Sequence, residues 1–368
     1  MRLLYVVAKA EYFISHRLAL AKDAQSKGFK VAVATTQFPQ KDTSRIQGIK
    51  SFLIRFKRGS VNIFLEFFTI YDLFIAFWKF RPNIVHNVAL KPALYGTFIS
   101  RLFCVPSVNA LNGFGYIFTS SQNKARIIRP FLRFALKLIL NHKSVKVIVQ
   151  NNQDYNDCRV LLPKSEISLI LGSGVDIDAF YPVHYDGVFT FTLVARMLWS
   201  KGIGEFVDAA RLFKQRNPSQ DVRFWLVGSP DEQNPESIAI EDLRGWRDEG
   251  VVEWQEHTED IQNIYAQSHV AVLPSYREGM PKSLLEAMAC GLPIVTSDAR
   301  GCADIVREGN GIKVPVKNVK ALTEAFEKCF SDMDACKIMG KEGRADAQKL
   351  YCINAINGQV IKLYETIH

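Results

Sequence analysis

The sequence has few cysteines, and their spacing builds no recognisable site. Seven cysteines occur among 368 residues. None forms a C-x-x-C pair, and none accompanies histidines at the spacing of zinc ligands, so neither a disulfide framework nor a zinc site is supported. A reducing cytosol is the simplest home for such a chain.

Long hydrophobic runs are also scarce. At the N-terminus only five apolar residues, 3–7, precede the first interrupting charges, which predicts a strand and not a signal peptide. Residues 61–80 are rich in aromatics, but four polar residues interrupt them, and a charge in mid-span costs about 3 kcal/mol. That segment predicts a buried helix ending at Arg81-Pro82. With 48% hydrophobic and 23% charged residues, the composition excludes disordered, collagen-like and polytopic membrane proteins.

The net charge of +9 is unevenly distributed. Residues 1–185 hold 25 Lys and Arg against 10 Asp and Glu, or +15, and residues 186–368 hold 21 against 27, or −6, which sum to +9. A basic half suits nucleic acid, an anionic membrane or phosphorylated ligands. The acidic second half argues against one continuous nucleic-acid track.

Both halves alternate short β-branched runs with amphipathic stretches, the pattern of βαβ units. Strands are expected at 3–7, 30–35, 51–55, 83–86, 145–149, 189–195, 222–227, 270–274 and 293–297. The length suits two domains, with a linker beginning near Gly172. We therefore expect an α/β protein with two Rossmann-like, doubly wound parallel-sheet domains, 1–180 and 181–350, facing a central cleft. A C-terminal helix in 351–368 is expected to pack back on the first domain.

Residues 125–140 predict a helix with a cationic stripe, kinked at Pro130. Four basic residues recur at steps of three, four and four, within an arc of about 80°. They are Arg126, Arg129, Arg133 and Lys137. Two interpretations stay open: a helix in the membrane interface, where each cation adds about 1 kcal/mol near anionic lipid, or a solvated charged face above the core.

The sharpest motif is EGMPKSLLE, residues 278–286. Pro281 suits the first helical position and Gly291 the position after the last, which predicts a helix of about ten residues. The free N–H groups around Lys282 to Leu284 would form an anion site. Glu278 and Glu286 would flank the anion and accept hydrogen bonds from sugar hydroxyls. The alternative is an ordinary helix start with one acidic residue.

A second element points to the same ligand. Arg196 and Lys201 flank the turn after strand 189–195, at the sheet edge that also carries the motif helix. Two cations there would offset the charge of a diphosphate. The alternative is that both are surface residues paired with nearby carboxylates.

These motifs resemble the nucleotide-sugar site of retaining glycosyltransferases of family 4, which have the GT-B fold. The segments YFISHR, IVHNVALKPALYG, NGFGYIFTS, GSGVDIDAFYP and ARMLWSKG extend the resemblance over nearly the whole chain. They are similar to the branch that acts on polyprenyl-diphosphate-linked sugars in bacterial glycoprotein, O-antigen and capsule assembly. Two positions depart from the family pattern: Ala8-Lys9-Ala10-Glu11 replaces two consecutive glycines, and Val88 stands where many members have a histidine.

The resemblance implies a role for each matching residue. The catalytic residues would be Glu278, which holds the transferred hexose, and Arg196 and Lys201, which bind the diphosphate. The donor would also contact Gly279, Met280, Pro281, Lys282, Ser283, Leu284 and Glu286, the last at the ribose. Candidate acceptor-binding residues are His16, Arg17, His86, Lys91, Gly113 and Gly115. For His16 and Arg17 a surface pair at a helix terminus is the alternative.

The resemblance thus implies a retaining transferase that uses no metal and no cofactor. It would move a hexose or N-acetylhexosamine from a nucleotide diphosphate sugar, UDP-linked, to a polyprenyl-diphosphate-linked saccharide. The enzyme would be cytoplasmic and peripheral on the inner face of the membrane, without a nucleic-acid partner. Asp176-x-Asp178 lies in the linker and is not expected to bind metal. The alternatives are a GT-B nucleotide-sugar 2-epimerase and a basic nucleic-acid-binding protein.

Overall fold

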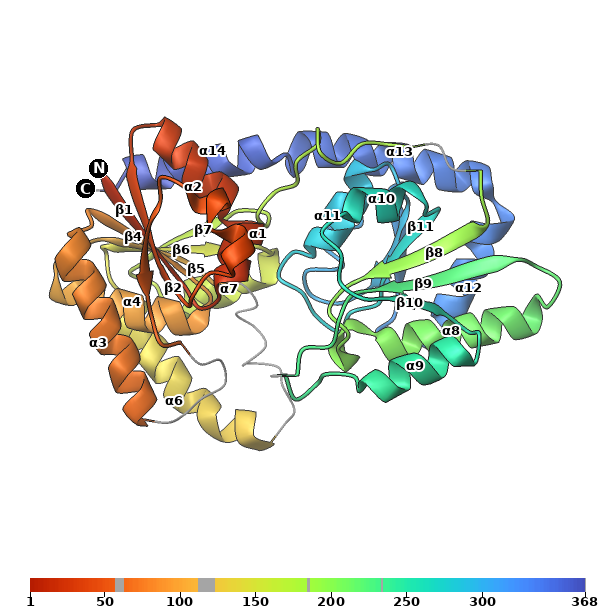
Figure 1. Ribbon diagram of the computed structural model, residues 1–368, viewed down its shortest axis with the longest axis horizontal. Coiled ribbons are helices and arrows are strands. Elements are labelled where there is room, and N and C mark those ends of the chain that lie inside the picture. The colour runs from red at the N-terminus through yellow and green to blue at the C-terminus, as the bar shows by residue number, and fades with distance from the viewer. Residues whose placement is uncertain (57–62, 112–122, 184–185, 233, 368) are drawn as a thin grey trace. The chain divides into compact units, whose positions relative to one another are not determined.

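A computed structural model describes residues 1–56, 63–111, 123–183, 186–232 and 234–367 (Figure 1). Of Lys41, Ile63 and residues 123–128 it describes the backbone alone. The chain divides into two compact units, unit 1 with Met1–Ser173 and Ile356–His368, and unit 2 with Gly174–Ala355. Each unit has its own parallel sheet with helices, so the predicted α/β class and the pair of Rossmann-like domains are confirmed.

The sheet of unit 1 has seven strands in the part of the chain that the structure describes, in the order β3-β2-β1-β4-β5-β6-β7. All neighbours are parallel. The strands are β1 (Arg2–Val7), β2 (Lys30–Thr35), β3 (Lys50–Leu53), β4 (Ile84–Val88), β5 (Ser107–Ala110), β6 (Val145–Val149) and β7 (Glu166–Leu169).

Helices cover both faces of this sheet. They are α1 (Ala10–His16), α2 (Leu18–Ser26), α3 (Ile63–Phe80), α4 (Leu90–Leu102), α6 (Asn123–Leu140), α7 (Asn152–Leu161) and α14 (Ile353–Glu365), with short 3-10 helices η1 (Gln40–Asp42) and η2 (Ser44–Ile46). The core on one face joins β1, β2 and β4 to α1, α2 and α14. The core on the other face includes α3, α4 and α6.

Unit 2 repeats the arrangement with six strands among its described residues, in the order β10-β9-β8-β11-β12-β13. All neighbours are again parallel. The strands are β8 (Phe189–Val194), β9 (Val222–Val227), β10 (Glu253–Gln255), β11 (Val270–Leu273), β12 (Ile294–Ser297) and β13 (Gly311–Val314). The helices are η3 (Trp199–Lys201), α8 (Ile203–Arg216), α9 (Ile240–Asp248), α10 (Ile261–Ala266), α11 (Lys282–Ala289), α12 (Val319–Ser331) and α13 (Met333–Leu350).

The core of unit 2 contains a cluster of packed phenylalanine rings. Phe191 of β8 stacks on Phe224 of β9 with ring centroids 5.2 Å apart, and Phe326 of α12 packs on both. Phe206 and Phe213 of α8 complete the cluster. These large apolar side chains fix α8 and α12 on one face of the sheet.

In both sheets the strand order reverses between the first and the fourth strand along the chain. Open parallel sheets bind ligands at this switch point, beside the carboxyl ends of the strands. The switch points lie between β1 and β4 in unit 1 and between β8 and β11 in unit 2. The fold therefore directs attention to the turns that follow these four strands.

The domain boundary differs from the predicted one. The sequence suggested residue 180, whereas unit 1 ends at Ser173 and unit 2 takes the segment that follows. Arg344 of α13 explains the difference, because its guanidinium donates to the carbonyls of Ile177 and Phe180 as well as to that of Ala289. These bonds attach the linker to unit 2. The end of α14, from Ile356, belongs to unit 1.

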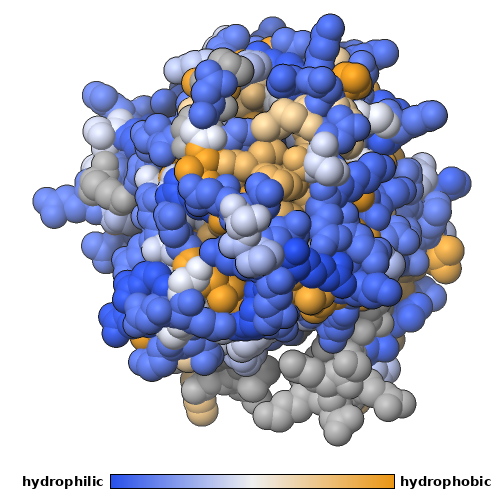
Figure 2. Space-filling view, turned by 90° about the vertical axis from the view of Figure 1, so that its right-hand side faces the viewer, coloured by the Kyte–Doolittle hydropathy of each residue, from blue (hydrophilic) through white to orange (hydrophobic). Residues whose placement is uncertain are grey.

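The predicted helix that ends at Arg81-Pro82 is confirmed, but its predicted burial is correct for one side only. The segment from Ile63 is helical, as α3, but only one side of it is buried, with Leu73, Ala76 and Phe77 in the core. Its other side exposes aromatic rings, such as Phe67 and Trp78. Figure 2 shows a different face of the molecule, the right-hand side of Figure 1. That face is mainly hydrophilic, with limited hydrophobic areas.

Helix α6 buries one part of its apolar side and exposes another. Leu136 and Leu140 are buried in the core, while Phe131, Phe134 and Leu138 are exposed beside the cations. The apolar face is thus shared between core and surface. Among the described helices, none combines the length and the apolar character needed to cross a bilayer.

Candidate functional site

Two turns of unit 2 bring predicted donor residues together at one edge of the sheet. Strands β8 and β11 are parallel neighbours, so the turns after Val194 and Leu273 leave the sheet at the same edge. The first turn carries Arg196 and Lys201, and the second carries Glu278 and leads into α11. This edge is the switch point of unit 2.

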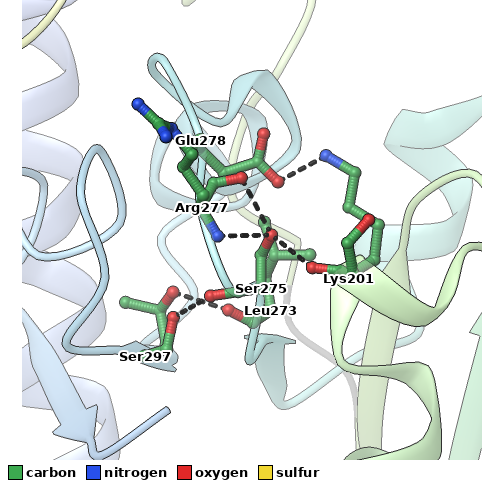
Figure 3. A network of polar contacts seen from close by, with 8 residues as sticks. Lys201, Leu273, Ser275, Arg277, Glu278 and Ser297 are labelled. Atoms are coloured by element: carbon green, nitrogen blue, oxygen red, sulfur yellow. Dashed lines mark hydrogen bonds and ion pairs between the residues drawn. The ribbon is translucent and has the colours of Figure 1, made fainter. Parts of the chain in front are cut away.

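Lys201 and Glu278 form an ion pair between the two turns. The side chains point toward each other, with Lys201 Nζ donating to Glu278 Oε1 (Figure 3). They are only 19% and 14% exposed, so solvent screens the pair less than it would a surface pair. The cation predicted to hold a diphosphate and the carboxylate predicted to hold a hexose are therefore adjacent.

Backbone contacts hold these two turns in place. The N–H of Tyr276 and the hydroxyl of Ser275 both donate to the carbonyl of Ser200, at 2.9 and 3.1 Å. Gly202 has φ +73°, and a Cβ there would lie 2.2 Å from the carbonyl oxygen of Pro274. Only glycine allows this approach, so the position of Lys201 depends on its neighbour.

The loop that carries Glu278 is supported from behind by the turn after β12. The N–H of Glu278 donates to the carbonyl of Arg300 at 2.9 Å, and the hydroxyl of Ser297 donates to the carbonyl of Ser275 (Figure 3). Gly301 has φ +79°, and a Cβ there would lie 2.3 Å from the carbonyl oxygen of Glu278. No sequence motif marks these supporting residues.

Arg196 pairs with an acidic residue that the sequence analysis missed. Its Nη1 lies 2.5 Å from Oδ2 of Asp231, in the turn after β9. Pairing with a nearby carboxylate was the alternative for both Arg196 and Lys201, and the structure shows it for both. The available signal was the position of Asp231 shortly after a strand, because such residues reach the same sheet edge.

Helix α11 begins one residue later than predicted and has eight residues, not ten. Pro281 is its N-cap with φ −73°, and Gly291 lies two residues beyond the last helical residue with φ +76°. The N–H groups of Leu284 and Leu285 donate to the carbonyl of Pro281. The N–H of Leu284 is therefore not available to an anion. Of the amides predicted to bind one, those of Lys282 and Ser283 remain.

Glu286 is buried inside the first two turns of α11. It is 7% exposed, and its Oε1 lies 3.0 Å from Nζ of Lys282. Burial raises the pKa of this carboxyl, and Lys282 partly opposes the rise. The hydroxyl of Tyr265 donates to the carbonyl of Ser283 at 2.6 Å, which holds the start of the helix from below.

In unit 1, Arg17 lies at the junction of α1 and α2. It is 5% exposed, and one guanidinium nitrogen donates to the carbonyl of His16 at 3.0 Å. Its Nε is buried without a hydrogen-bond partner among the described residues. His16 stacks on Tyr12 and contacts Ser15 Oγ at 2.7 Å. A buried guanidinium of this kind is suited to an anionic ligand.

His86 lies in the core and not at the rim of the sheet. It is 1% exposed, stacks on Tyr5, and its Nδ1 lies 2.5 Å from the hydroxyl of Tyr364 in α14. Burial, aided by the charge of Arg17, lowers its pKa well below the usual value. The histidine is therefore neutral, and its surroundings fit packing better than contact with an acceptor.

The remaining predicted residues do not join the sites described above. Lys91 pairs with Glu66 of α3 at 2.5 Å, and Glu66 also accepts from Tyr95 at 2.7 Å. Gly113, Gly115 and the side chain of Arg126 lie outside the described residues.

Asp176 accepts from the N–H groups of Asp178 and Ala179, both at 3.0 Å, so its carboxylate caps a turn. Within the described part of the chain, no cluster of three metal-ligating side chains occurs.

Comparison with family models assigns both units. A model described as "Glycosyl transferase 4-like" matches residues 2–151, and a model described as "Glycosyl transferases group 1" matches residues 188–332. The two matches fall on unit 1 and unit 2.

Two curated relatives align over most of the chain. The chain is 26% identical to the N,N'-diacetylbacillosaminyl-diphospho-undecaprenol alpha-1,3-N-acetylgalactosaminyltransferase of Campylobacter jejuni, over 96% of this chain and 98% of the relative. It is also 26% identical to the UDP-Gal:alpha-D-GlcNAc-diphosphoundecaprenol alpha-1,3-galactosyltransferase of Escherichia coli, over 80% and 78%.

Solved structures share the fold of the whole chain. Sucrose-phosphate synthase of Thermosynechococcus elongatus superposes with a TM-score of 0.82 at 21% identity, over 99% of this chain and 98% of that one. HepE of Anabaena, in complex with UDP-glucose, gives a TM-score of 0.79 at 17% identity over the full length of both chains.

Proposed function

The chain belongs to the group 1, 4-like glycosyltransferases of GT-B fold, and from this premise we propose that it glycosylates a saccharide carried on polyprenyl diphosphate. The sugar moved is a hexose or N-acetylhexosamine, and the donor is its nucleotide diphosphate, UDP-linked. The activities for which the Campylobacter and E. coli relatives are named support this class of acceptor, and the name of the E. coli enzyme supports a UDP donor.

The observation that carries the proposal is the Lys201–Glu278 pair beside the start of α11. The switch point of unit 2 presents a cation, a carboxylate and the first amides of a helix within two connected turns. A nucleotide sugar needs these three features, because its diphosphate is anionic and its sugar offers hydroxyl donors. When the donor binds, it would separate this ion pair: Lys201 would bind the diphosphate, and Glu278 would accept hydrogen bonds from the hexose.

The chemistry then depends on stabilising the leaving group. As the bond from the anomeric carbon to the phosphate oxygen breaks, negative charge grows on the β-phosphate and positive charge on the sugar ring. Lys201, Arg196 and the amides at the start of α11 would stabilise the former charge without a metal or a cofactor. Glu286 would hold the ribose hydroxyls from inside the helix.

The anomeric configuration would be retained by attack from the same face as the leaving group. Glu278 is the only acidic residue of the donor motif near the hexose position, and it is assigned to the hydroxyls. The acceptor hydroxyl would therefore lose its proton to the departing phosphate oxygen while it bonds to the anomeric carbon. Analysis of the anomeric configuration of the product by NMR tests this step.

The acceptor side rests on unit 1. Buried Arg17, with His16 beside it, is suited to the diphosphate of a lipid-linked acceptor. Helix α6, with Arg129, Arg133 and Lys137, would lie against the membrane that holds the lipid. The enzyme would then act at the inner face of the cytoplasmic membrane, without nucleic acid. The family matches do not favour a 2-epimerase or a nucleic-acid binder.

The decisive experiment combines a donor panel with one substitution. Purified protein is offered UDP- and GDP-sugars with a polyprenyl-diphosphate-linked disaccharide, and product is measured by mass spectrometry. Glu278→Gln should lower kcat by about 100-fold or more, because a charged hydrogen bond to the hexose is lost in the transition state. The exposed Glu241→Gln of α9 is the control and should transfer normally. Equal turnover of both variants would refute the role of Glu278.

A further inference from the structure

Helix α3 presents an aromatic face to the surface of unit 1. Six of its aromatic side chains are between 38% and 80% exposed. They are Phe64, Phe67, Phe68, Tyr71, Phe74 and Trp78, and we call them the aromatic face. At 100° per residue they fall within an arc of about 120°, opposite the buried Leu73. An exposed apolar stripe of this size marks an interaction surface.

Two neighbouring helices, α4 and α6, also expose apolar residues. Helix α4 packs against both α3 and α6, and all three cover the same face of the sheet (Figure 1). Helix α4 exposes Phe98 and Leu102. Arg101 of α4 donates to the carbonyl of Leu138 in α6 at 2.8 Å, which fixes the two helices together. The exposed apolar residues of α6 extend the surface further.

The charges around this surface are arranged for an anionic partner. Helix α3 has two acidic residues, and both are neutralised by cations: Asp72 by Arg55 at 2.7 Å, and Glu66 by Lys91 at 2.5 Å. The negative charges of Asp72 and Glu66 are therefore both offset by a neighbouring positive charge. Arg133 and Lys137 of α6 add exposed positive charge beside its apolar side chains.

We propose that α3 is the part of the protein that inserts into an anionic lipid bilayer, with its aromatic face in the headgroup region and α6 supplying cations to the lipid. The inference rests on the proposed function, since a lipid-linked acceptor lies in a bilayer. It assigns to α3 an insertion role that neither the sequence motifs nor the family matches contain.

The chemistry of the surface favours a bilayer over a protein partner. Trp, Tyr and Phe are the side chains that prefer the boundary between headgroups and acyl chains. Basic residues on a neighbouring helix complement anionic headgroups, and each adds about 1 kcal/mol of attraction near such a surface. A helix that is apolar on one side and anchored to the core on the other lies in the plane of the interface.

The first test measures vesicle binding of the full chain. Vesicles of phosphatidylcholine with about one third phosphatidylglycerol provide both an apolar layer and negative charge. Phe67→Ser with Trp78→Ser should weaken partitioning by about tenfold or more, because two inserted rings are lost. The control combines Met333→Ser with Ile338→Ser, two exposed apolar positions of α13 in unit 2, and should bind as the wild type does. Unchanged thermal unfolding of both variants shows that they fold.

The second test locates Trp78 directly. It is the only one of the five tryptophans within residues 1–173, since the others are Trp199, Trp225, Trp246 and Trp254. Lipids brominated on the acyl chain should quench part of the fluorescence of the bound protein, and Trp78→Phe should abolish that part while binding persists. Absence of quenching that depends on Trp78 would overturn the proposal, as would a lipid-free dimer broken by Phe67→Ser with Trp78→Ser.

The outcome is separable from that of the enzymatic proposal. If quenching through Trp78 is seen but no donor supports transfer, the surface stands and the proposed reaction fails. If transfer is seen and depends on Glu278, while the α3 variants bind vesicles normally, the reaction stands and the inserted helix is refuted. With a short, water-soluble acceptor the α3 variants should keep wild-type turnover.

Discussion

At the scale of single residues, Arg17 combines a cost in stability with a use in binding. A guanidinium that is 5% exposed has left most of its hydration shell, and its Nε has no hydrogen-bond partner among the described residues. Isolated buried charges destabilise folded proteins, and such groups persist where a ligand needs them. An acceptor diphosphate would supply the missing negative charge.

Replacing Arg17 by methionine should therefore separate stability from activity. Arg17→Met should increase the free energy of unfolding by about 1 kcal/mol or more, because a side chain of similar length is buried without charge. Transfer to the lipid-linked acceptor should fall at least tenfold, mainly through KM. Urea denaturation and steady-state kinetics measure the two effects. The exposed Arg244→Met should change stability by less than about 0.5 kcal/mol, and a destabilised Arg17→Met would show that Arg17 is a structural residue.

Glu286 gives a pH-dependent prediction. Burial raises its pKa in the folded chain, while the unfolded carboxyl keeps its ordinary value. Between these values the folded chain holds a proton that the unfolded chain has lost, so stability decreases as the pH rises through this window and is restored below it.

The Glu286→Gln variant lacks this titration. Its thermal midpoint relative to the wild type should be higher at pH 7 than at pH 4, whereas Glu308→Gln, at an exposed position, should show no such trend. Nucleotide affinity, measured by calorimetry, should fall about tenfold because the ribose loses a charged acceptor. A pH-independent difference between variant and wild type would contradict the stated effect of burial.

Residue positions were predictable where they follow strands, and unpredictable where they depend on distant contacts. Lys201 and Glu278 each follow a recognisable strand, so their sheet edge could be inferred from the sequence alone. The partner of Arg196 was missed because Asp231, 35 residues away, lies in a turn without a motif, where its position after a strand was the available signal. The burial of His86 depends on Tyr364, 278 residues further along the chain.

At the scale of elements, strands with continuous β-branched runs were predicted well. The segments 30–35, 145–149 and 222–227 match β2, β6 and β9 at both ends. Strands β5, β7, β10 and β13 were missed, because they have only three or four residues, too few for a clear pattern, and three of them, β7, β10 and β13, are edge strands. The orientation of α3 was missed for another reason: aromatic residues mark a core helix and an exposed interfacial helix alike.

The turn between β8 and α8 gives a prediction at this scale. Gly202→Ala places a Cβ 2.2 Å from the carbonyl oxygen of Pro274 at a φ of +73°, so the turn must shift away from β11. We expect a loss of stability of about 1–3 kcal/mol and at least tenfold lower nucleotide affinity, because Lys201 moves with the turn.

The matched control is Gly245→Ala in α9, where an added Cβ meets no atom within 4 Å. It should stabilise the helix by up to about 1 kcal/mol and leave binding unchanged. Calorimetric titration with UDP and denaturant unfolding measure both variants. If Gly202→Ala binds UDP as the wild type does, the turn does not position the diphosphate site.

At the scale of the whole molecule, the division of charge follows the division into units. The basic first half forms most of unit 1, which carries Arg17, α3 and α6, and the acidic second half forms most of unit 2. This asymmetry was visible in the sequence, and the C-terminal helix was likewise expected to return to the first domain, as α14 does from Ile356. Buried Tyr364, Val360 and Ile361 make that last helix part of the core of unit 1.

The same asymmetry predicts how binding to membranes should depend on charge. Arg133→Glu with Lys137→Glu changes the charge of α6 by −4 without touching the buried Leu136 and Leu140. At about 1 kcal/mol per cation, the loss of attraction alone should weaken binding to anionic vesicles at least tenfold, and binding of the wild type should fall as salt is raised. Lys320→Glu with Lys337→Glu, both exposed in unit 2, is the matched charge control and should bind normally.

Because the aromatic face of α3 contributes through apolar contact, the α6 variant should keep residual binding that salt does not remove. Equal loss in both variants would mean that net charge, and not the position of α6, directs the protein to the lipid.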